Sequence, residues 1–330
     1  MTQYINTTNI PLSLAVFLAT DNYDHSNEAS HVSATSLLKS VRQLILSNRV
    51  PTEDAGIDLG NMVSSRMGSA IHDAIESAWV DADKREKALQ LLGYPKSVID
   101  RIRINPSKED LQTNEDIIPV YLELRSKREI DGFTVSGKFD FVAEGRVEDF
   151  KTTSTYTAMN NTKDADYILQ GSIYRWLNPE IITSDTMAIQ FIFTDWSGAK
   201  ARTDPNYPQK RFQTRVFNLL SLQETESFIR KKLALISKYW SANAEDIPEC
   251  TDDELWRSEP VWKYYKNPEK LSRSTKNFDS KQEAYIRLAE DGGVGIIKEV
   301  PGQAVACKFC AAFSACNQKD SLISSGDLIL

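Results

Sequence analysis

The chain has 330 residues, which is enough for one large domain or two smaller ones with a substantial buried core. Its 41% hydrophobic and 26% charged residues are ordinary for a soluble globular protein, and no apolar run approaches the roughly 20 residues that cross a bilayer. The net charge of −7 argues against a protein that coats nucleic acid nonspecifically, but a local basic groove would still be enough for a nuclease. Without a secretory signal at the N-terminus, a cytoplasmic protein with no membrane attachment is expected.

The pattern of apolar residues predicts helices and strands in an order that is typical of a mixed sheet with helices packed on it. Residues 1–33 are polar and mixed, and we expect a loosely ordered lead-in there. Apolar stripes with helical spacing follow within 36–46 and within 65–80. The further elements expected, in chain order, are a charged helix at 82–93, strands within 117–151, a helix at 164–177, strands at 186–196 and 211–219, and a helix at 222–242.

Two strand-like runs around residues 144–145 predict a hairpin that brings two carboxylates together. When the segment FTVSGKFDFVAEGRVEDFK is folded about that turn, Val142 pairs with Val147 and Asp140 lies opposite Asp149. Opposed residues have Cβ atoms about 4.5–5.5 Å apart, and like charges in such positions destabilise a sheet. A divalent cation removes the conflict, and Mg²⁺ or Mn²⁺ prefers carboxylate oxygens.

Lys151 is expected on the same face as Asp149, because strand side chains alternate with a period of two. The carbonyl of Phe150 could supply a further oxygen to the metal. Lys151 would then orient or deprotonate the metal-bound water, since burial can depress the pKa of a lysine. The alternative is an edge hairpin with solvated aspartates and a salt-bridged lysine. The opposed aspartates and their apolar neighbours favour the metal site.

The cysteines form a second candidate metal site. Cys307, Cys310 and Cys316 follow a C-x₂-C-x₅-C pattern, and Cys250 is the only other thiol of the chain. Four thiolates suit Zn²⁺ or a [4Fe–4S] cluster, and clustered cysteines in a cytosolic protein are more often metal ligands than disulfides. Such a site would staple the C-terminal region and stabilise the fold, because ligation energy becomes folding energy. The alternative is four unrelated buried thiols.

Two basic segments are candidates for contact with nucleic acid. Six cations lie within 263–281, where Tyr264, Tyr265 and Phe278 are interleaved, and five lie within 200–215. Bases can stack on such rings while cations follow the phosphate backbone. The alternative is two solvated faces, and no helix-turn-helix or zinc-finger pattern indicates that the protein reads sequence.

Together these motifs resemble those of the RecB-like PD-(D/E)XK nucleases, over roughly residues 34–318. GKFDFV followed by VEDFKTTS resembles the G-x-x-D … D-x-K signature of this family, which includes the CRISPR-adaptation nucleases and the nuclease domain of AddB. His72 resembles the histidine that the family carries on an early helix. Gln170 and Tyr174 resemble its Q-x-x-x-Y motif, and CKFCAAFSAC matches its iron–sulfur signature.

The resemblance implies an α/β fold with a restriction-endonuclease-like PD-(D/E)XK core, in which helices flank a mixed central sheet. It divides the chain into a lead-in at 1–33, a nuclease core at 34–245 and a metal-cluster and DNA-contact region at 246–330. It also favours a [4Fe–4S] cluster over Zn²⁺. One departure concerns Cys250, which follows the core here, whereas the first ligand precedes it in the CRISPR-adaptation nucleases and AddB. In this respect the chain looks more like phage-encoded members.

The resemblance also assigns roles to individual residues. His72 would lie near the metal or the scissile phosphate, and Gln170 and Tyr174, one helical turn apart, would face the site together. Glu123 and Glu129 precede the hairpin and are expected to be surface charges rather than further acids.

The function implied is a metal-dependent DNA exonuclease that hydrolyses phosphodiester bonds at DNA ends or in single strands, in phage DNA metabolism or recombination. Protein partners in recombination or replication would fit that setting. One alternative is an end-trimming nuclease within a larger complex of the CRISPR-adaptation type. Another is a non-catalytic scaffold that binds DNA ends, although a scaffold has no need of opposed carboxylates.

Overall fold

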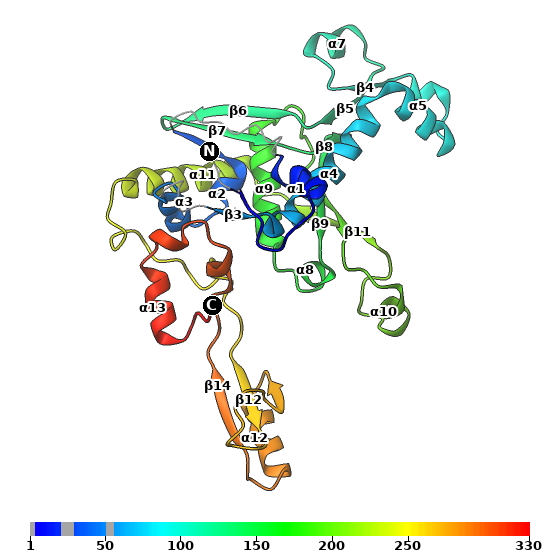
Figure 1. Ribbon diagram of the computed structural model, residues 1–330. Coiled ribbons are helices and arrows are strands. Elements are labelled where there is room, and N and C mark those ends of the chain that lie inside the picture. Colours follow the sequence, from blue (N-terminus) through cyan, green and yellow to red (C-terminus); the bar gives the residue numbers. More distant parts are fainter. Residues whose placement is uncertain (1–3, 21–29, 51–55) are drawn as a thin grey trace. The chain divides into compact units, whose positions relative to one another are not determined.

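The computed structural model describes residues 4–20, 30–50 and 56–330, and these form two compact units (Figure 1). The first unit comprises the described residues of 1–38 and 56–233, and the second those of 39–55 and 234–330. The boundaries expected from the sequence, at residues 33 and 245, separate segments of different expected function, and they stay a prediction. None of the helices in the described ranges combines the length and the apolar character that crossing a membrane requires.

A six-stranded mixed sheet forms the centre of the first unit. Its strands are β4 (Ile102–Ile104), β5 (Ile118–Leu122), β8 (Phe141–Ala143), β9 (Arg146–Thr153), β10 (Thr186–Phe193) and β11 (Phe212–Asn218). They are arranged in the order β11-β10-β9-β8-β5-β4, parallel between β9 and β10 and between β4 and β5, and antiparallel elsewhere. The expected mixed α/β class is therefore confirmed.

Helices α4 (Leu59–Val80) and α9 (Asp164–Leu177) flank this sheet on its two faces. Phe150 of β9 contacts the His72 ring of α4, whereas Lys151, which points to the other face, lies near the Tyr167 ring of α9. The approach of α9 to β10 needs a glycine, because a Cβ at Gly171 would overlap a methionine side chain of β10. The helix that was expected over residues 164–177 has those same bounds.

A smaller sheet of the first unit has the strand order β2-β7-β6. Its strands are β2 (His31–Ser33), β6 (Arg125–Ile130) and β7 (Phe133–Lys138). The lead-in is more ordered than expected in its described part, since β2 pairs with β7 and helix α1 (Leu12–Ala19) packs against α4. Burial of Leu18 and Val32 gives the physical reason, because these apolar side chains leave water.

The single helix expected over residues 36–46 is two helices, α2 (Ala34–Leu37) and α3 (Val41–Ser47). The hydroxyls of Ser33 and Ser40 each accept an N-cap hydrogen bond, so each serine begins a new helix. The remaining elements of the chain up to residue 239 are β1 (Tyr4–Ile5), β3 (Ile57–Asp58), α5 (Ala82–Leu91), α6 (Lys96–Ile99), α7 (Lys108–Thr113), α8 (Thr155–Met159), α10 (Gly198–Thr203) and α11 (Leu222–Tyr239).

The second unit contains two small apolar cores. Strands β12 (Val261–Tyr265), β13 (Lys276–Phe278) and β14 (Ile296–Val300) form an antiparallel sheet, and helix α12 (Lys281–Glu290) packs on one of its faces. We call residues 261–300 the strand module. The other core gathers Leu255, Ala304, Leu322 and Leu328 around the cysteine segment, which contains η1 (Val305–Phe309), η2 (Phe313–Ala315) and α13 (Gln318–Ser325).

Candidate functional site

Strands β8 and β9 form the expected hairpin, and Val142 lies opposite Val147 as predicted. Glu144 and Gly145 make the turn with φ of 51° and 74°, the left-handed conformation that both central residues of a tight hairpin turn adopt. The ladder begins one residue after Asp140. The turn thus fixes the register that brings Asp140 close to the strand with the second aspartate.

Asp140 leaves the ladder, so the directly opposed pair of aspartates expected from the sequence is not formed. Its Oδ2 instead accepts a hydrogen bond of 2.8 Å from the backbone amide of Phe150. The two carboxylates still act on each other. Burial, and after it the negative charge of Asp149, raise the pKa of Asp140 well above its ordinary value.

Asp149 is buried at 1% exposure, and neither of its carboxylate oxygens has a hydrogen-bond partner among the described residues. The ammonium of Lys151 lies 2.5 Å from Oδ2 as an ion pair, without the angles of a hydrogen bond. Burial lowers the pKa of Lys151, but the charges of Asp149 and Asp140 raise it, and the net direction is upward. The expectation that burial depresses this pKa is therefore wrong for the metal-free site, where Lys151 neutralises Asp149.

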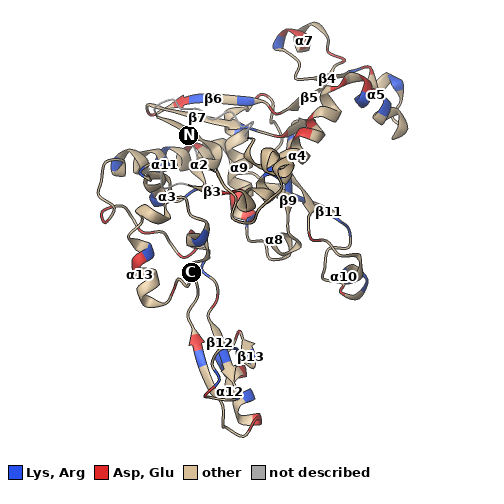
Figure 2. Cartoon of the chain, viewed as in Figure 1, with Lys and Arg blue, Asp and Glu red and all other residues tan. Residues whose placement is uncertain are grey.

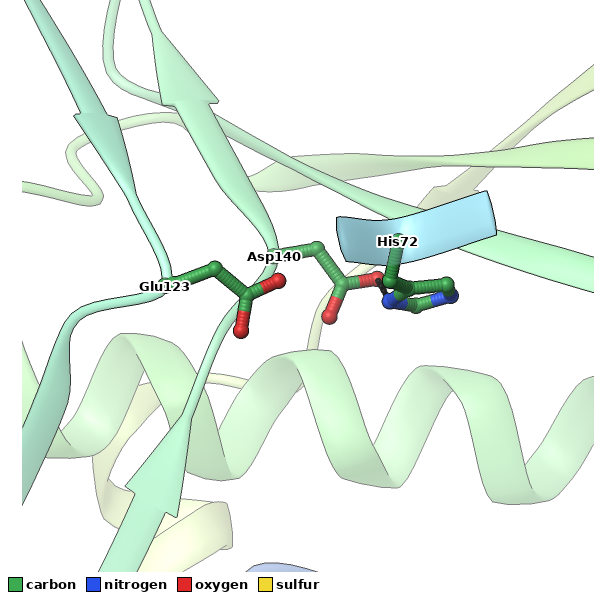
Figure 3. Close-up of side chains that lie close together, drawn as sticks. All are labelled: His72, Glu123 and Asp140. Carbon is green, nitrogen blue, oxygen red and sulfur yellow. Dashed lines mark ion pairs between the residues drawn. The ribbon is translucent and has the colours of Figure 1, made fainter. Parts of the chain in front are cut away.

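His72 projects from α4 toward Phe150 of β9 and toward Asp140, which precedes β8. Its Nε2 lies 2.9 Å from the Phe150 carbonyl, and its Nδ1 lies 3.6 Å from Oδ2 of Asp140. His72, Glu123 and Asp140 each offer one atom that could bind a metal ion, and these three atoms lie within 4.8 Å of one another. Figure 3 shows the three side chains in a row with Asp140 in the middle. Two carboxylates and an imidazole form a donor set that suits a divalent cation.

Glu123 is the candidate ligand that the sequence analysis missed, because it was expected to be a surface charge. Its side chain is 13% exposed and pairs with Lys138. Strand β5 pairs with β8 through Leu122 and Phe141, so the next residues outward, Glu123 and Asp140, become neighbours. Only knowledge of this long-range pairing would have identified Glu123 as a candidate ligand. Glu129 is exposed, as expected.

Gln170 and Tyr174 lie on α9 and contact each other, since Nε2 of Gln170 donates a 2.7 Å hydrogen bond to the Tyr174 hydroxyl. Both side chains are buried. Tyr174 also packs against β7, where a Cβ at Gly137 would lie 3.0 Å from its ring. This contact gives the glycine of the G-x-x-D motif a packing role.

A cleft of about 650 Å³ opens beside His72, Glu123, Asp140 and Tyr174. Three cations also line it: Arg66, Arg125 and Lys138. Asp149 and Lys151 are not among its lining residues: Asp149 is buried, and the Lys151 ammonium lies 5.9 Å from the centre of the Tyr167 ring of α9. The cleft thus combines candidate metal ligands with cations that can bind phosphate oxygens.

The four cysteines are free and converge in the second unit. Cys316 lies close enough to Cys250, Cys307 and Cys310 to act electrostatically on each. Burial raises the pKa of the Cys250 thiol to about 11. Among the described residues, no three thiols lie within 4.8 Å of one another. Four thiolates that converge in this way suit either a zinc ion or a [4Fe–4S] cluster.

The aromatic rings of the basic segment 263–281 are not placed as expected. Tyr264, Tyr265 and Phe278 are buried, and Tyr264 and Phe278 belong to the core of the strand module, so the expected stacking of bases on these rings is wrong. Cations remain exposed on the module, and Figure 2 shows blue segments on both β12 and β14. In the other segment Arg215 forms an ion pair with Asp164 at 2.5 Å.

No family model and no curated protein matches the sequence. Among solved structures, the chain is 16% identical to SSO0001, with a TM-score of 0.38, and the match covers 64% of this chain and 79% of that one. It is also 16% identical to a phage-related exonuclease from Haemophilus somnus 129PT, with a TM-score of 0.28 and coverage of 64% and 93%. These likenesses are weak, and the function proposed below rests on the site itself.

Proposed function

We propose that the chain is a metal-dependent deoxyribonuclease with a PD-(D/E)XK core of the RecB-like type. One observation carries the proposal: Asp149 is buried with both carboxylate oxygens unsatisfied, next to Asp140 and its neighbours Glu123 and His72. A buried carboxylate without hydrogen bonds is costly unless a counter-charge or a metal compensates it. Lys151 pairs with Asp149 and Lys138 pairs with Glu123, so among the described residues the third carboxylate, Asp140, has only His72 as an ion-pair partner.

The residues that would hold Mg²⁺ or Mn²⁺ are His72, Glu123, Asp140 and Asp149, with the carbonyl of Phe150. When bound, the metal would activate a water molecule and stabilise charge on the phosphate. A proton on Nε2 of His72 would be donated to the Phe150 carbonyl, which leaves the lone pair of Nδ1 directed to the side of Asp140. Such a hydrogen bond from the second ring nitrogen is common in metal-binding histidines.

Lys151 would act as a cation in the metal-free site, where the charges of Asp149 and Asp140 hold its pKa above the ordinary value. A protonated lysine beside the scissile phosphate stabilises the charge that develops on the phosphate oxygens. Tyr174 lines the cleft, and its hydrogen bond with Gln170 would fix the hydroxyl there.

The finer parts of the proposal rest on the motif resemblance. These are the exonuclease action, the preference for DNA ends or single strands, and the setting in phage DNA metabolism or recombination. The resemblance also favours a structural [4Fe–4S] cluster on the four cysteines, with Zn²⁺ as the alternative.

Digestion of end-labelled linear DNA and closed circular DNA, each single- and double-stranded, tests the proposed activity. We expect the parent protein to shorten linear DNA from its ends with Mg²⁺ and to leave it intact with chelator. Asp149→Asn should abolish cleavage but retain the circular dichroism of the parent. If the parent bound DNA ends and cleaved nothing with Mg²⁺ or Mn²⁺, the scaffold alternative would replace the nuclease.

A further inference from the structure

Arg42 of α3 is a charged side chain in the interior of the second unit. It is 2% exposed. Its Nε donates to Sγ of Cys316 at 3.3 Å, its Nη1 donates to the carbonyl of Ile247 at 2.7 Å, and its Nη2 donates to the side chain of Asn317. No carboxylate forms an ion pair with it among the residues that the structure describes. Its polar partners are therefore two neutral oxygens and one thiol.

This environment is unfavourable for a guanidinium unless an anion lies nearby. Arginine cannot lose its proton in a protein, and a buried charge without a counter-charge is strongly destabilising. The groups at hand that can become anions are the sulfurs. Arg42 contacts Cys316 directly, and the Cys250 thiol lies 3.2 Å from the hydroxyl of Ser40, two residues before Arg42.

We propose that Arg42 is a positioning residue for the cysteine metal centre, and that its charge offsets the charge of the ligated thiolates. This inference rests on the proposed four-thiolate centre and adds to it a residue that no motif contains. Four thiolates with a zinc ion or an oxidised cubane core carry a net charge of about −2, so a buried cation beside them is stabilising. Without a metal, no carboxylate among the described residues takes the place of that negative charge beside Arg42.

Arg42 also connects segments that are far apart in the sequence. Cys316 is 274 residues away and Ile247 is 205 residues away, and α3 packs against η2. Metal binding would therefore strengthen the attachment of residues 39–50 to the cysteine segment through a single guanidinium.

The test compares Arg42→Met in metal-loaded protein and in protein stripped by chelator, with thermal unfolding and metal release as the two measurements. In the loaded state, Arg42→Met should lower the melting temperature and speed metal release by about tenfold, as loss of an outer-shell partner does. In the stripped state it should leave the melting temperature unchanged or raise it, because a buried unpaired charge has been removed. Arg42→Lys, which keeps the charge, should fall between the two.

Arg49→Met is the matched control, because Arg49 is an exposed arginine of the same segment that donates to the carbonyl of Trp240 and contacts no thiol. It should change neither measurement. An equal loss of stability for Arg42→Met in the loaded and stripped states would show a merely structural role and overturn the inference. If the centre contains iron, its reduction potential should also fall in Arg42→Met, since a nearby cation favours the more negative reduced form. Parent protein that carries no metal after anaerobic purification would overturn the centre itself.

Discussion

At the scale of single residues, the candidate active site is a set of charges that the metal-free fold does not balance. Asp140 shows this most clearly, because burial and Asp149 raise its pKa well above the ordinary value of 3.8. A pKa that is higher in the folded state means that folding favours the protonated carboxyl. The stability from this group is complete below the unfolded-state pKa and is lost as the pH rises through the folded-state pKa.

The first prediction follows from that sign. In chelator, Asp140→Asn should melt at a higher temperature than the parent near pH 7, and the difference should shrink toward zero as the pH falls to about 4. A gain of about 1 kcal/mol would raise the melting temperature by about 2–4 °C. Added Mg²⁺ should stabilise the parent more than the variant. A variant that melts below the parent in chelator at pH 7 would contradict the proposed repulsion.

The second prediction concerns Glu123, whose carboxylate lies with Asp140 and His72. Glu123→Gln should lower the cleavage rate by at least about tenfold at low Mg²⁺, with partial recovery at high Mg²⁺, because one metal ligand is weakened. Glu129→Gln is the control, since Glu129 is exposed on β6 and hydrogen-bonds only locally to Thr134. Equal activity of the two variants at every Mg²⁺ concentration would remove Glu123 from the site.

At the scale of elements, the strand module places two cations opposite each other. Lys263 of β12 pairs directly with Lys298 of β14 in the antiparallel ladder. Like charges in such positions destabilise a sheet. Trp262, Tyr264 and Ile297 occupy the face that packs on α12, so the two lysines point to the opposite face by alternation. A phosphate backbone laid across that face would relieve the repulsion.

The third prediction is that Lys263→Gln with Lys298→Gln weakens DNA binding and makes it less dependent on salt. Loss of two phosphate contacts should reduce the slope of log K against log salt by about 1.8 for duplex DNA and about 1.4 for single strands. Fluorescence anisotropy of labelled oligonucleotides measures both. Lys96→Gln, which removes a cation that lies outside both basic segments and pairs with Asp100, is the control and should leave the slope unchanged. An unchanged slope in the double variant would place the DNA elsewhere.

Local patterns predicted those elements whose form depends on neighbouring residues. The helix over 164–177 and the hairpin register around 144–145 follow from apolar periodicity and turn chemistry, and both are found. Long-range pairing was not predictable in the same way. Glu123 joins Asp140 only because β5 pairs with β8, and Tyr264 is buried only because α12 covers its strand. Neither contact can be recognised from the residues of its own segment.

At the scale of the whole molecule, the cysteines and the hydrolytic residues belong to different compact units. Cys250, Cys307, Cys310 and Cys316 lie in the second unit, and the residues proposed to bind Mg²⁺ lie in the first. Loss of the cluster should therefore act on stability or on DNA binding, and not on the chemical step itself.

The fourth prediction tests this separation. Anaerobically purified protein should be brown, with about four irons per chain, whereas a zinc protein would be colourless. Cys316→Ser should lose the metal and lower the melting temperature, because metal binding stabilises only the folded form. Cleavage by the fraction that remains folded should continue with Mg²⁺. If metal-free Cys316→Ser were as stable as the loaded parent, the centre would have no structural role.

The described residues of 39–55 belong with residues 234–330, although the first unit surrounds them in the sequence. During synthesis Arg42 of α3 emerges from the ribosome long before Ile247 and Cys316, its hydrogen-bond partners 205 and 274 residues later. The second unit can therefore complete its fold only after Cys316 has been synthesised. A nascent chain stalled before the cysteines would expose α3 to chaperones and proteases, so incomplete products should be removed rather than accumulate as active nuclease fragments.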